Sequence, residues 1–499
     1  MLTLCVRVFM AIMIANVLSA SFLTFSGGSW SSLSFVYIVS FFIGLLMVSP
    51  ALAGRNWVLG TKDRWAIYFI VGFFIVCFIG VRVPYVLETV FGQVSGSVTG
   101  DDLWHVQELL SLTLSKQFPP LYGVFSKDYL LFYYTPWMLM AALMAYIPSV
   151  FASAKFAYAL GYAIYILLAV PIVVALIRCI SMNRSQFWMM IFLILGHAGM
   201  QSFNVFGFPF ASHENWMGHY HVYVQFSAFS TLFIWVIHHV VAAITLLLAY
   251  LIYNDRAASL GRVSCFRRCL TLGLLFASAA MGSPFVCMGA VPLALWILWR
   301  DRTSVISYLL GSLSVAAIVV SPLLWIYLQK PSDFRFFSNI QIFFEGKWGV
   351  LPNVLLSGCV FLILVAMEFI VPLVLWIRMR RAKIQMAFQD KVFLGIAIAM
   401  IGSTFLVGYG IYNNYAMRAT ILPIWVGLWV LARYSDRLPK LEGKKRVFAL
   451  FFVGCMVLGS LNEIGSVGKA AVEELQLFIS SDPARIRIFQ INQEYRQFP

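Results

Sequence analysis

Charged residues are scarce in this sequence. Only 11% of the 499 residues are charged, whereas ordinary soluble proteins carry about 25%. Apolar residues make up 61%, which is more apolar surface than a soluble fold can bury. The shortage of charge therefore excludes an ordinary soluble protein and predicts a chain that crosses a membrane many times.

Three other features are missing as well. The eight cysteines form no CxxC pair and lie mostly in apolar segments, which argues against a structural zinc site or a disulfide framework. Internal repeats of the kind that many transporters carry are not found. Long apolar runs such as 304–327 do not alternate with a period of two, which excludes a transmembrane β-barrel and predicts helices.

Apolar segments run along most of the chain, and a membrane span needs about 20 such residues. The candidate segments are 4–25, 33–53, 66–84, 131–148, 156–178, 186–204, 229–252, 270–283, 285–299, 304–328, 352–377, 392–412, 419–433 and 447–462. We expect an all-α polytopic helical membrane protein with about 13 transmembrane helices. Residues 1–462 form its transmembrane domain, and residues 463–499 form a short outer C-terminal tail.

Basic residues indicate the orientation, because cytoplasmic loops are enriched in Lys and Arg. Four segments are basic and are predicted to be cytoplasmic: 54–64, 254–268, 378–383 and 433–446. The segments between them, 85–130, 205–228, 329–350 and 412–418, then face the other side. The net charge of +15 arises largely from these short loops, so we expect no nucleic-acid partner.

Segment 131–148 conflicts with the number of crossings that this arrangement requires. An odd number of spans must connect the outer loop 85–130 to the basic, predicted cytoplasmic stretch 178–184, but two apolar segments lie between them. The first of these, 131–148, is short, contains Pro136 and lies between an outer loop and the basic stretch 178–184. We therefore predict that it enters the outer leaflet, or lies along it, without crossing. The basic loops fit a bacterial inner membrane, and the lack of an N-x-S/T pattern on the outer face agrees with it, although an endoplasmic-reticulum protein would obey the same charge rule.

The longest outer loop, 85–130, contains the stretch SVTGDDLWHVQELLSL. The stretch contains four ionisable residues, Asp101, Asp102, His105 and Glu108. Their spacing places Asp101, His105 and Glu108 on one face of an amphipathic helix, which would lie on the membrane surface. One interpretation is an N-cap with a second aspartate favoured by the helix dipole. The alternative is a general base or a carboxylate ligand for a divalent cation, Mg²⁺ or Mn²⁺.

A second outer cluster lies in FASHENWMGHYHVYVQFS, residues 210–227. It contains His213, Glu214, His219 and His221 between aromatic residues. These side chains are candidates for polar contacts to a sugar or phosphate, while their spacing matches no standard zinc template. An aromatic belt with interfacial hydrogen-bonding groups is the alternative.

Arg418, in the outer segment 412–418, lies where the positive-inside rule disfavours a basic residue. Arginine suits bidentate phosphate binding, but it also extends to lipid headgroups. Inside the predicted spans, His238, His239 and Glu368 are ionisable. Such residues mark functional sites by default, as in a proton-coupled transporter, or are bonded within the helical bundle.

The acidic pair, the amphipathic helix and the sequence PPLY at 119–122 resemble, in this order, the GT-C superfamily of polytopic glycosyltransferases. The resemblance covers about residues 66–180. It implies a polyprenyl-phosphate sugar donor, a glycan or lipid-linked acceptor, and a site facing the periplasm or exterior. Asp101 or Asp102 would be the catalytic base, with the other binding a metal or the donor.

By the same resemblance, Arg418 would contact the donor phosphate. The chain departs from the family in having two additional spans before the acidic loop. Two other functions stay open. One is a transporter or flippase for a lipid-linked saccharide, and the other is an O-antigen polymerase or ligase.

Overall fold

The computed structural model describes a large part of the chain. The described residues are 2–26, 30–51, 64–65, 68, 72, 105–106, 108–109, 111–113, 135–145, 154–180, 183–195, 226, 232–233, 236–254, 262–300, 306–328, 336–337, 349–409, 415–438 and 443. The predicted spans 66–84 and 447–462 and the tail 463–499 lie wholly or almost wholly outside this part.

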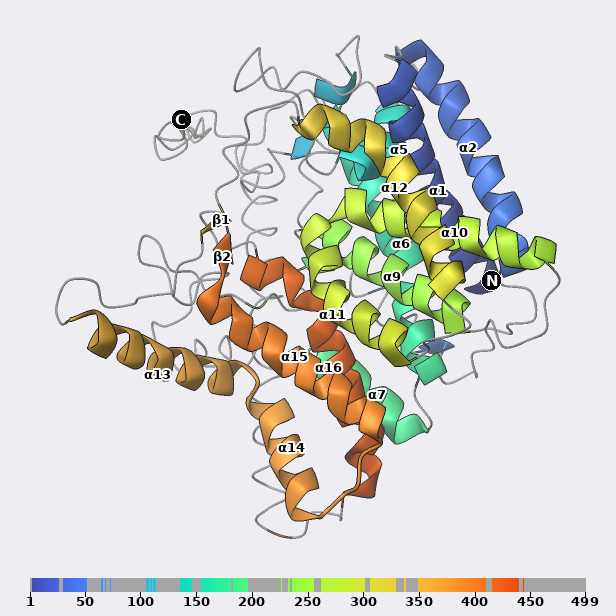
Figure 1. Cartoon of the computed structure of the whole chain (residues 1–499). Helices are drawn as coiled ribbons and strands as arrows, with labels where there is room; N and C mark the ends of the chain where they lie inside the picture. The colour runs from blue at the N-terminus through green and yellow to red at the C-terminus, as the bar shows by residue number, and fades with distance from the viewer. Residues whose placement is uncertain are drawn as a thin grey trace, which may run out of the picture.

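The described part of the chain is helical, apart from one pair of two-residue strands (Figure 1). Its α-helices are α1 (Leu2–Ser26), α2 (Trp30–Ala51), α5 (Thr135–Ala145), α6 (Ala154–Ile180), α7 (Arg184–Leu195), α9 (Ile237–Asn254), α10 (Arg262–Gly282), α11 (Pro284–Arg300), α12 (Ile306–Leu328), α13 (Val350–Glu368), α14 (Ile370–Arg381), α15 (Phe388–Leu406) and α16 (Ile421–Tyr434). A π-helical turn, η3 (Tyr415–Ala419), precedes α16, and a 3₁₀ turn, η4 (Ser435–Arg437), follows it.

Several helices are long and apolar enough to cross a membrane. Six candidate spans lie in the described residues: Thr3–Ser26, Ala157–Arg178, Ile237–Asn254, Val350–Glu368, Phe388–Leu406 and Tyr415–Arg437. Shorter apolar helices accompany them in α2, α11 and α12. Backbone groups in lipid must be paired internally, and helices achieve this. The described helices are therefore compatible with an integral membrane protein.

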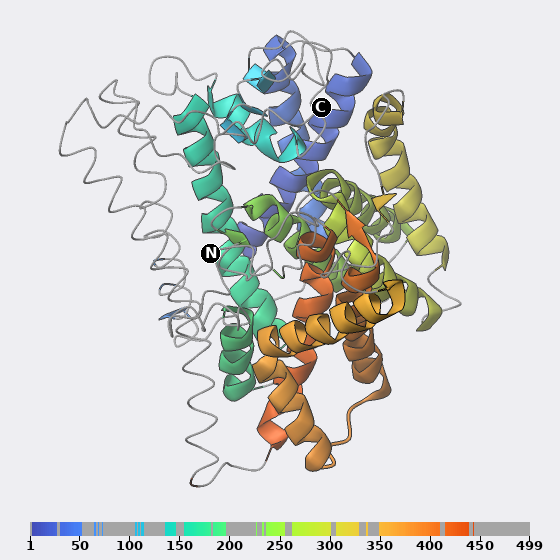
Figure 2. The same cartoon turned by 90° about the vertical axis from the view of Figure 1, so that its left-hand side faces the viewer.

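The first two helices pack on each other and belong to the main core. Helix α1 also contacts α5, α6, α10 and α12, and its Phe9, Met10 and Ile14 are fully buried. Figure 2, turned by 90°, shows α6 passing along one side of the molecule next to these elements. A second, smaller core joins α11, α14, α15 and α16.

A buried chain of hydrogen bonds crosses this first group of helices. The Asn16 Nδ2 of α1 donates to the Tyr165 hydroxyl of α6 over 2.9 Å, and the Tyr37 hydroxyl of α2 donates to Asn16 Oδ1 over 2.9 Å. Tyr165 in turn donates to the backbone carbonyl of Trp137 in α5, also over 2.9 Å. Four helices are thereby held in one relative position, and the position of Trp137 depends on α1.

A second polar network joins α7, α15 and α16. The Tyr434 hydroxyl donates to Asp390 Oδ2 over 2.6 Å, and Arg433 lies 3.4 Å from the same oxygen. Gln186 Nε2 donates to the carbonyl oxygen of Arg433 over 2.6 Å. This network lies beside segments 378–383 and 433–446, which the sequence predicts to be cytoplasmic.

The predicted span 352–377 is divided into α13 and α14 at Phe369. Proline has no N–H, and its ring clashes with the carbonyl group four residues earlier. Pro372 therefore cannot bond to Glu368, the last residue of α13. The proline explains why the apolar run forms two helices, which point in different directions in Figure 1.

Strands β1 (Phe336–Phe337) and β2 (Gly408–Tyr409) form an antiparallel pair. The pairing brings Phe336 and Phe337, in the predicted segment 329–350, beside the residues that follow α15. Both places are predicted to face the outer side, so the pairing agrees with the predicted topology.

The described part of the predicted segment 131–148 is helix α5, Thr135–Ala145. Its Trp137 to Ala142 are buried in the bundle, while both ends of the segment lie outside the described residues, so the prediction that it does not cross stays a prediction. Helix α10 begins at Arg262, before the predicted start at 270, because arginine is a good helix former whatever its hydropathy.

Candidate functional site

A buried hydrogen-bonded pair lies in the first predicted outer loop. The described residues of 105–113 are helical, and His105 Nδ1 lies 2.9 Å from Glu108 Oε2, one helical turn further on. Both side chains are buried, with relative exposures of 6% and 1%. A buried carboxylate needs a hydrogen-bonding partner, and the imidazole provides one.

This finding corrects one expectation. We predicted an amphipathic helix with a polar face on the membrane surface. Instead, His105 and Glu108 on the polar face are buried together with Val106, Leu109 and Leu112 on the apolar one, while Ser111 and Thr113 are half-buried. The polar face can be buried because its two polar side chains bond each other and contact aromatic rings.

Those rings come from α5, α6 and α9. The His105 ring lies 5.5 Å from the His238 ring and 5.7 Å from Trp137, measured between centroids. Trp137 stacks on His238 at 5.4 Å, with 23° between the ring planes, and Tyr158 stacks on His105 at 6.1 Å. His105, in the predicted first outer loop, is thus packed directly on the start of α9.

The start of α9 is fixed from two sides. The Tyr162 hydroxyl accepts a hydrogen bond from the backbone N–H of Ile237 and donates to the carbonyl oxygen of Phe233. His239 Nδ1 lies 2.8 Å from Ser283 Oγ, in the junction between α10 and α11. His238 and His239 therefore lie in the first turn of α9.

Arg418 approaches the same place from η3, the π-helical turn before α16. The turn η3 packs against α11, whose first residue follows Ser283, the hydrogen-bonding partner of His239. Single-turn π-helices occur often at functional sites. The turn itself is held by Thr420, whose hydroxyl donates to the carbonyl oxygen of Ala416 over 2.6 Å.

A glycine in α11 allows η3 to come this close. A Cβ atom on Gly289 would collide with the carbonyl oxygen of Ala419. Only a residue without a side chain lets the two backbones meet there. Gly289 thus determines how near Arg418 lies to the start of α9.

We refer to His105, Glu108, His238, His239 and Ser283 as the polar cluster. It contains three imidazoles, a carboxylate and a hydroxyl, with a guanidinium nearby. Imidazoles accept and donate protons, and arginine binds phosphate in a bidentate way. The cluster and Arg418 can therefore hold an anionic group and serve acid–base chemistry, although the cluster itself is covered by aromatic side chains.

The structure places three of the predicted site residues. His105 and Glu108 lie against the start of α9, and Arg418, more than 300 residues later in the chain, lies in η3, which packs on the adjacent helix α11. The other predicted site residues lie outside the described part: Asp101, Asp102, His213, Glu214, His219 and His221. Within the described part, no group of three or more His, Cys, Asp or Glu side chains is arranged to hold a metal ion.

Sequence reasoning missed Trp137, Tyr158 and Ser283. None of them belongs to a local pattern that predicts a site, because Trp137 and Tyr158 read as ordinary span residues and Ser283 as a turn. His238 and His239 were noticed as ionisable residues in a span, but their contact with His105 was not predicted. One indication of this contact was present in the sequence, namely the two adjacent histidines, His238 and His239, within an apolar segment.

Comparison of the chain with protein-family models, with curated proteins and with solved structures gave no match.

Proposed function

We propose that the protein is an integral membrane glycosyltransferase of the GT-C type, with about 13 transmembrane helices. It moves a sugar from a polyprenyl-phosphate donor to a glycan or lipid-linked acceptor. The site faces the periplasm or exterior, and the membrane is a bacterial inner membrane. The observation that carries the proposal is the packing of His105 on the start of α9, next to α11, on which the turn that contains Arg418 is packed.

The proposed reaction is a displacement at the anomeric carbon. Asp101 or Asp102 takes the proton of the acceptor hydroxyl, whose oxygen forms the new bond to that carbon. The bond to the phosphate oxygen breaks, and polyprenyl phosphate leaves with the electron pair. Arg418 binds the phosphate oxygens. The aspartate that is not the base orients the donor, or binds Mg²⁺ or Mn²⁺.

The acidic pair fits this scheme because it lies close in sequence to the polar cluster. Asp101 and Asp102 precede His105 by four and three residues, or about 6 Å along a helix. His105 is fixed by Glu108 and by the aromatic rings around it. The polar cluster is therefore proposed to position the acidic loop, with chemistry at the aspartates.

The first experiment uses purified protein in vesicles, with a radiolabelled polyprenyl-phosphate sugar and a lipid-linked acceptor. Asp101→Asn and Asp102→Asn are compared with Asp128→Asn, a matched control in the same loop. We expect at least one of the first two to lose 10²-fold or more, in the range of general-base catalysis, and the control to keep its activity. Full activity in both would refute the assignment.

The phosphate contact is tested at Arg418. Arg418→Lys keeps the charge and loses the bidentate geometry, whereas Arg418→Gln loses both. We expect the KM for the donor to rise in both, and more in Arg418→Gln. An unchanged KM in both variants removes Arg418 from the donor site.

Transport or flipping of a lipid-linked saccharide is the second candidate. Two buried acidic residues favour it: Glu368 at the end of α13 and Asp390 in α15, each 2% exposed. A transporter would move the labelled lipid between leaflets without releasing polyprenyl phosphate. A glycosyltransferase would release polyprenyl phosphate in equal amount to the sugar transferred, so the product analysis separates the two. An O-antigen polymerase or ligase would instead consume a diphosphate-linked glycan.

A further inference from the structure

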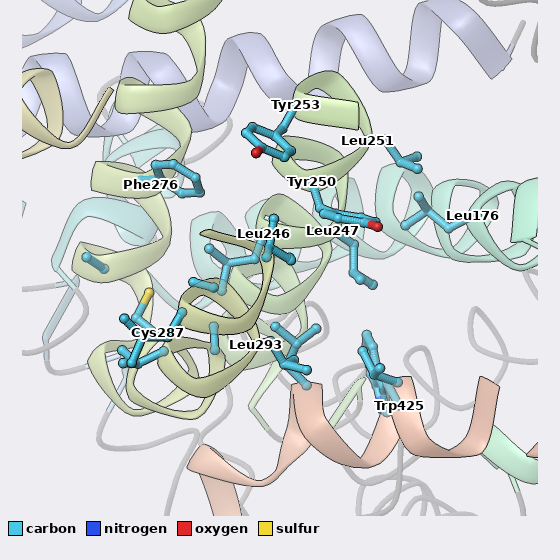
Figure 3. A pocket seen from close by; sticks show the side chains of 18 of the residues that line it. Leu176, Leu246, Leu247, Tyr250, Leu251, Tyr253, Phe276, Cys287, Leu293 and Trp425 are labelled. Carbon is cyan, nitrogen blue, oxygen red and sulfur yellow. The ribbon is translucent and has the colours of Figure 1, made fainter. Parts of the chain in front are cut away.

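A large apolar cavity begins about one helical turn from the polar cluster, at Cys287 of α11, and extends away from the cluster. Its volume is 640 Å³, and side chains of α6, α7, α9, α10, α11, α12, α15 and α16 line it (Figure 3). Ligand sites in proteins usually measure about 300–1,000 Å³. Figure 3 shows leucines, Phe276 and Trp425 around the space, with the hydroxyl groups of Tyr250 and Tyr253 as the polar atoms of the labelled residues. An apolar cavity of this size is costly to leave empty, so it suits a hydrocarbon occupant.

The cavity opens sideways between α11 and α12. Val291, Leu295 and Leu313 all belong to its lining and are also 50%, 59% and 46% exposed. Exposed apolar residues on membrane helices face lipid. A hydrocarbon chain can thus enter from the bilayer without passing through water.

The direction of the cavity follows from three helices that run side by side. Helices α9 and α11 start together, where His239 bonds Ser283, and Tyr162 of α6 bonds the first residue of α9. From there the lining continues to Ile177, Tyr253 and Leu298, close to the C-terminal ends of α6, α9 and α11. The polar cluster and the far end of the cavity are about 20 Å apart, since His239 and Tyr253 are separated by 14 residues of helix.

Two arginines follow the lining residues in sequence at the far end of the cavity. Arg178 follows the lining residue Ile177, and Arg300 lies two residues after the lining residue Leu298. Both arginines are at the end that the sequence predicts to be cytoplasmic, because Arg178 belongs to the basic stretch 178–184. Basic pockets between transmembrane helices on this side of a membrane bind anionic lipid headgroups.

We propose that the cavity holds one acyl chain of an anionic phospholipid whose headgroup phosphate binds at Arg178 and Arg300. The apolar lining explains the chain, the opening between α11 and α12 explains its entry, and the two arginines explain the preference for negative charge. The headgroup end of this site lies at the opposite end of α9 from the polar cluster, so the preference for an anionic lipid is tested separately from glycosyl transfer.

The experiment measures lipid binding to the full-length protein. The protein is purified with its lipids removed in detergent. Phosphatidylglycerol, phosphatidylcholine or a polyprenyl phosphate is then added, and bound lipid is counted by native mass spectrometry. We expect one phosphatidylglycerol to bind, with at least 10-fold higher affinity than phosphatidylcholine. Equal affinity for the two phospholipids, or a preference for the polyprenyl phosphate, overturns the proposal.

Variants separate the cavity from the general surface. Ala290→Leu adds a larger side chain to the lining, while Ser314→Leu adds the same side chain to the exposed face of α12, outside the lining. We expect the first to weaken phosphatidylglycerol binding at least 10-fold and the second to leave it unchanged. Equal binding by both variants contradicts the proposal.

The two arginines are tested with Arg178→Gln combined with Arg300→Gln. We expect this protein to lose its preference for phosphatidylglycerol over phosphatidylcholine while still binding one lipid. A retained preference overturns the assignment of the headgroup. The comparison of phosphatidylglycerol with phosphatidylcholine on the wild-type protein needs no substitution, so it tests the proposal even if a variant fails to fold.

Discussion

Gly289 in α11 allows a direct test of how η3 and Arg418 are positioned. A methyl group at this residue would meet the carbonyl oxygen of Ala419, which is backbone and cannot rotate away. Overpacking a well-filled interior costs about 1–3 kcal/mol, and a collision with backbone belongs at the upper end of that range. We therefore expect Gly289→Ala to lower the ratio of folded to unfolded protein by up to about 150-fold.

The assay is an unfolding titration of the purified protein with a denaturing detergent. Gly402→Ala is the matched control, because it is also a glycine in a long apolar helix and a Cβ atom there would meet nothing within 4 Å. We expect this control to be as stable as the wild type or more stable, since alanine favours helices over glycine. The reasoning fails if the two variants unfold at the same detergent concentration.

The same substitution connects stability with the proposed function. Moving α11 away from η3 would shift Arg418 relative to His238 and His239. If Arg418 binds the donor phosphate, the KM for the donor should rise in whatever fraction of Gly289→Ala remains folded. If Gly289→Ala is less stable but its KM for the donor is unchanged, Gly289 contributes to packing and not to the position of Arg418.

Three other substitutions test the described contacts. Glu108→Ala removes the partner of the buried His105 imidazole and should lower the free energy of unfolding by about 1–3 kcal/mol in the same titration. Glu108→Gln should lower it less, because its amide oxygen can still accept a hydrogen bond. An equal decrease in both variants would mean that the shape of the side chain matters and not the hydrogen bond. Asn16→Ala removes two interhelical hydrogen bonds and should cost about 1–3 kcal/mol at roughly 0.6–1.7 kcal/mol each, and an unchanged midpoint would show that the network contributes nothing to stability. Pro372→Ala restores an N–H that can bond to Glu368, so spin labels on α13 and α14 should move apart as the two helices straighten, and an unchanged distance would show that packing and not the proline sets the bend.

Much of the helical arrangement could be predicted because hydropathy alone determines where a chain can cross lipid. The predicted span 304–328 agrees with α12, Ile306–Leu328, to within two residues. The break at Phe369 was not predicted, although Pro372 was visible, because a proline in a membrane helix is often tolerated without ending it. Helix α10, Arg262–Gly282, begins before the predicted span 270–283, because hydropathy reports burial in lipid and not the extent of the helix.

The site was predicted in part for a different reason. His105, Glu108 and Arg418 stood out because charged or ionisable residues are costly near lipid and rarely occur there without a partner. Their partners were not visible, since the bond between His239 and Ser283 joins residues 44 positions apart and the Trp137–His238 stacking joins α5 to α9. Contacts of this length depend on how helices pack, which no local pattern encodes.

The side-chain amide of Asn16 has a consequence for the chain while it is being synthesised. Its partner Tyr165 lies 149 residues further along the chain, which at about 5–20 residues per second is roughly 7–30 s of ribosome time. During that interval the amide has only Tyr37, 21 residues away, as a companion. The hairpin of α1 and α2 must therefore bury this polar group until the later helices are synthesised. In the nascent chain the hydrogen bond from Tyr37 of α2 is then the one that satisfies the Asn16 amide, before Tyr165 is available.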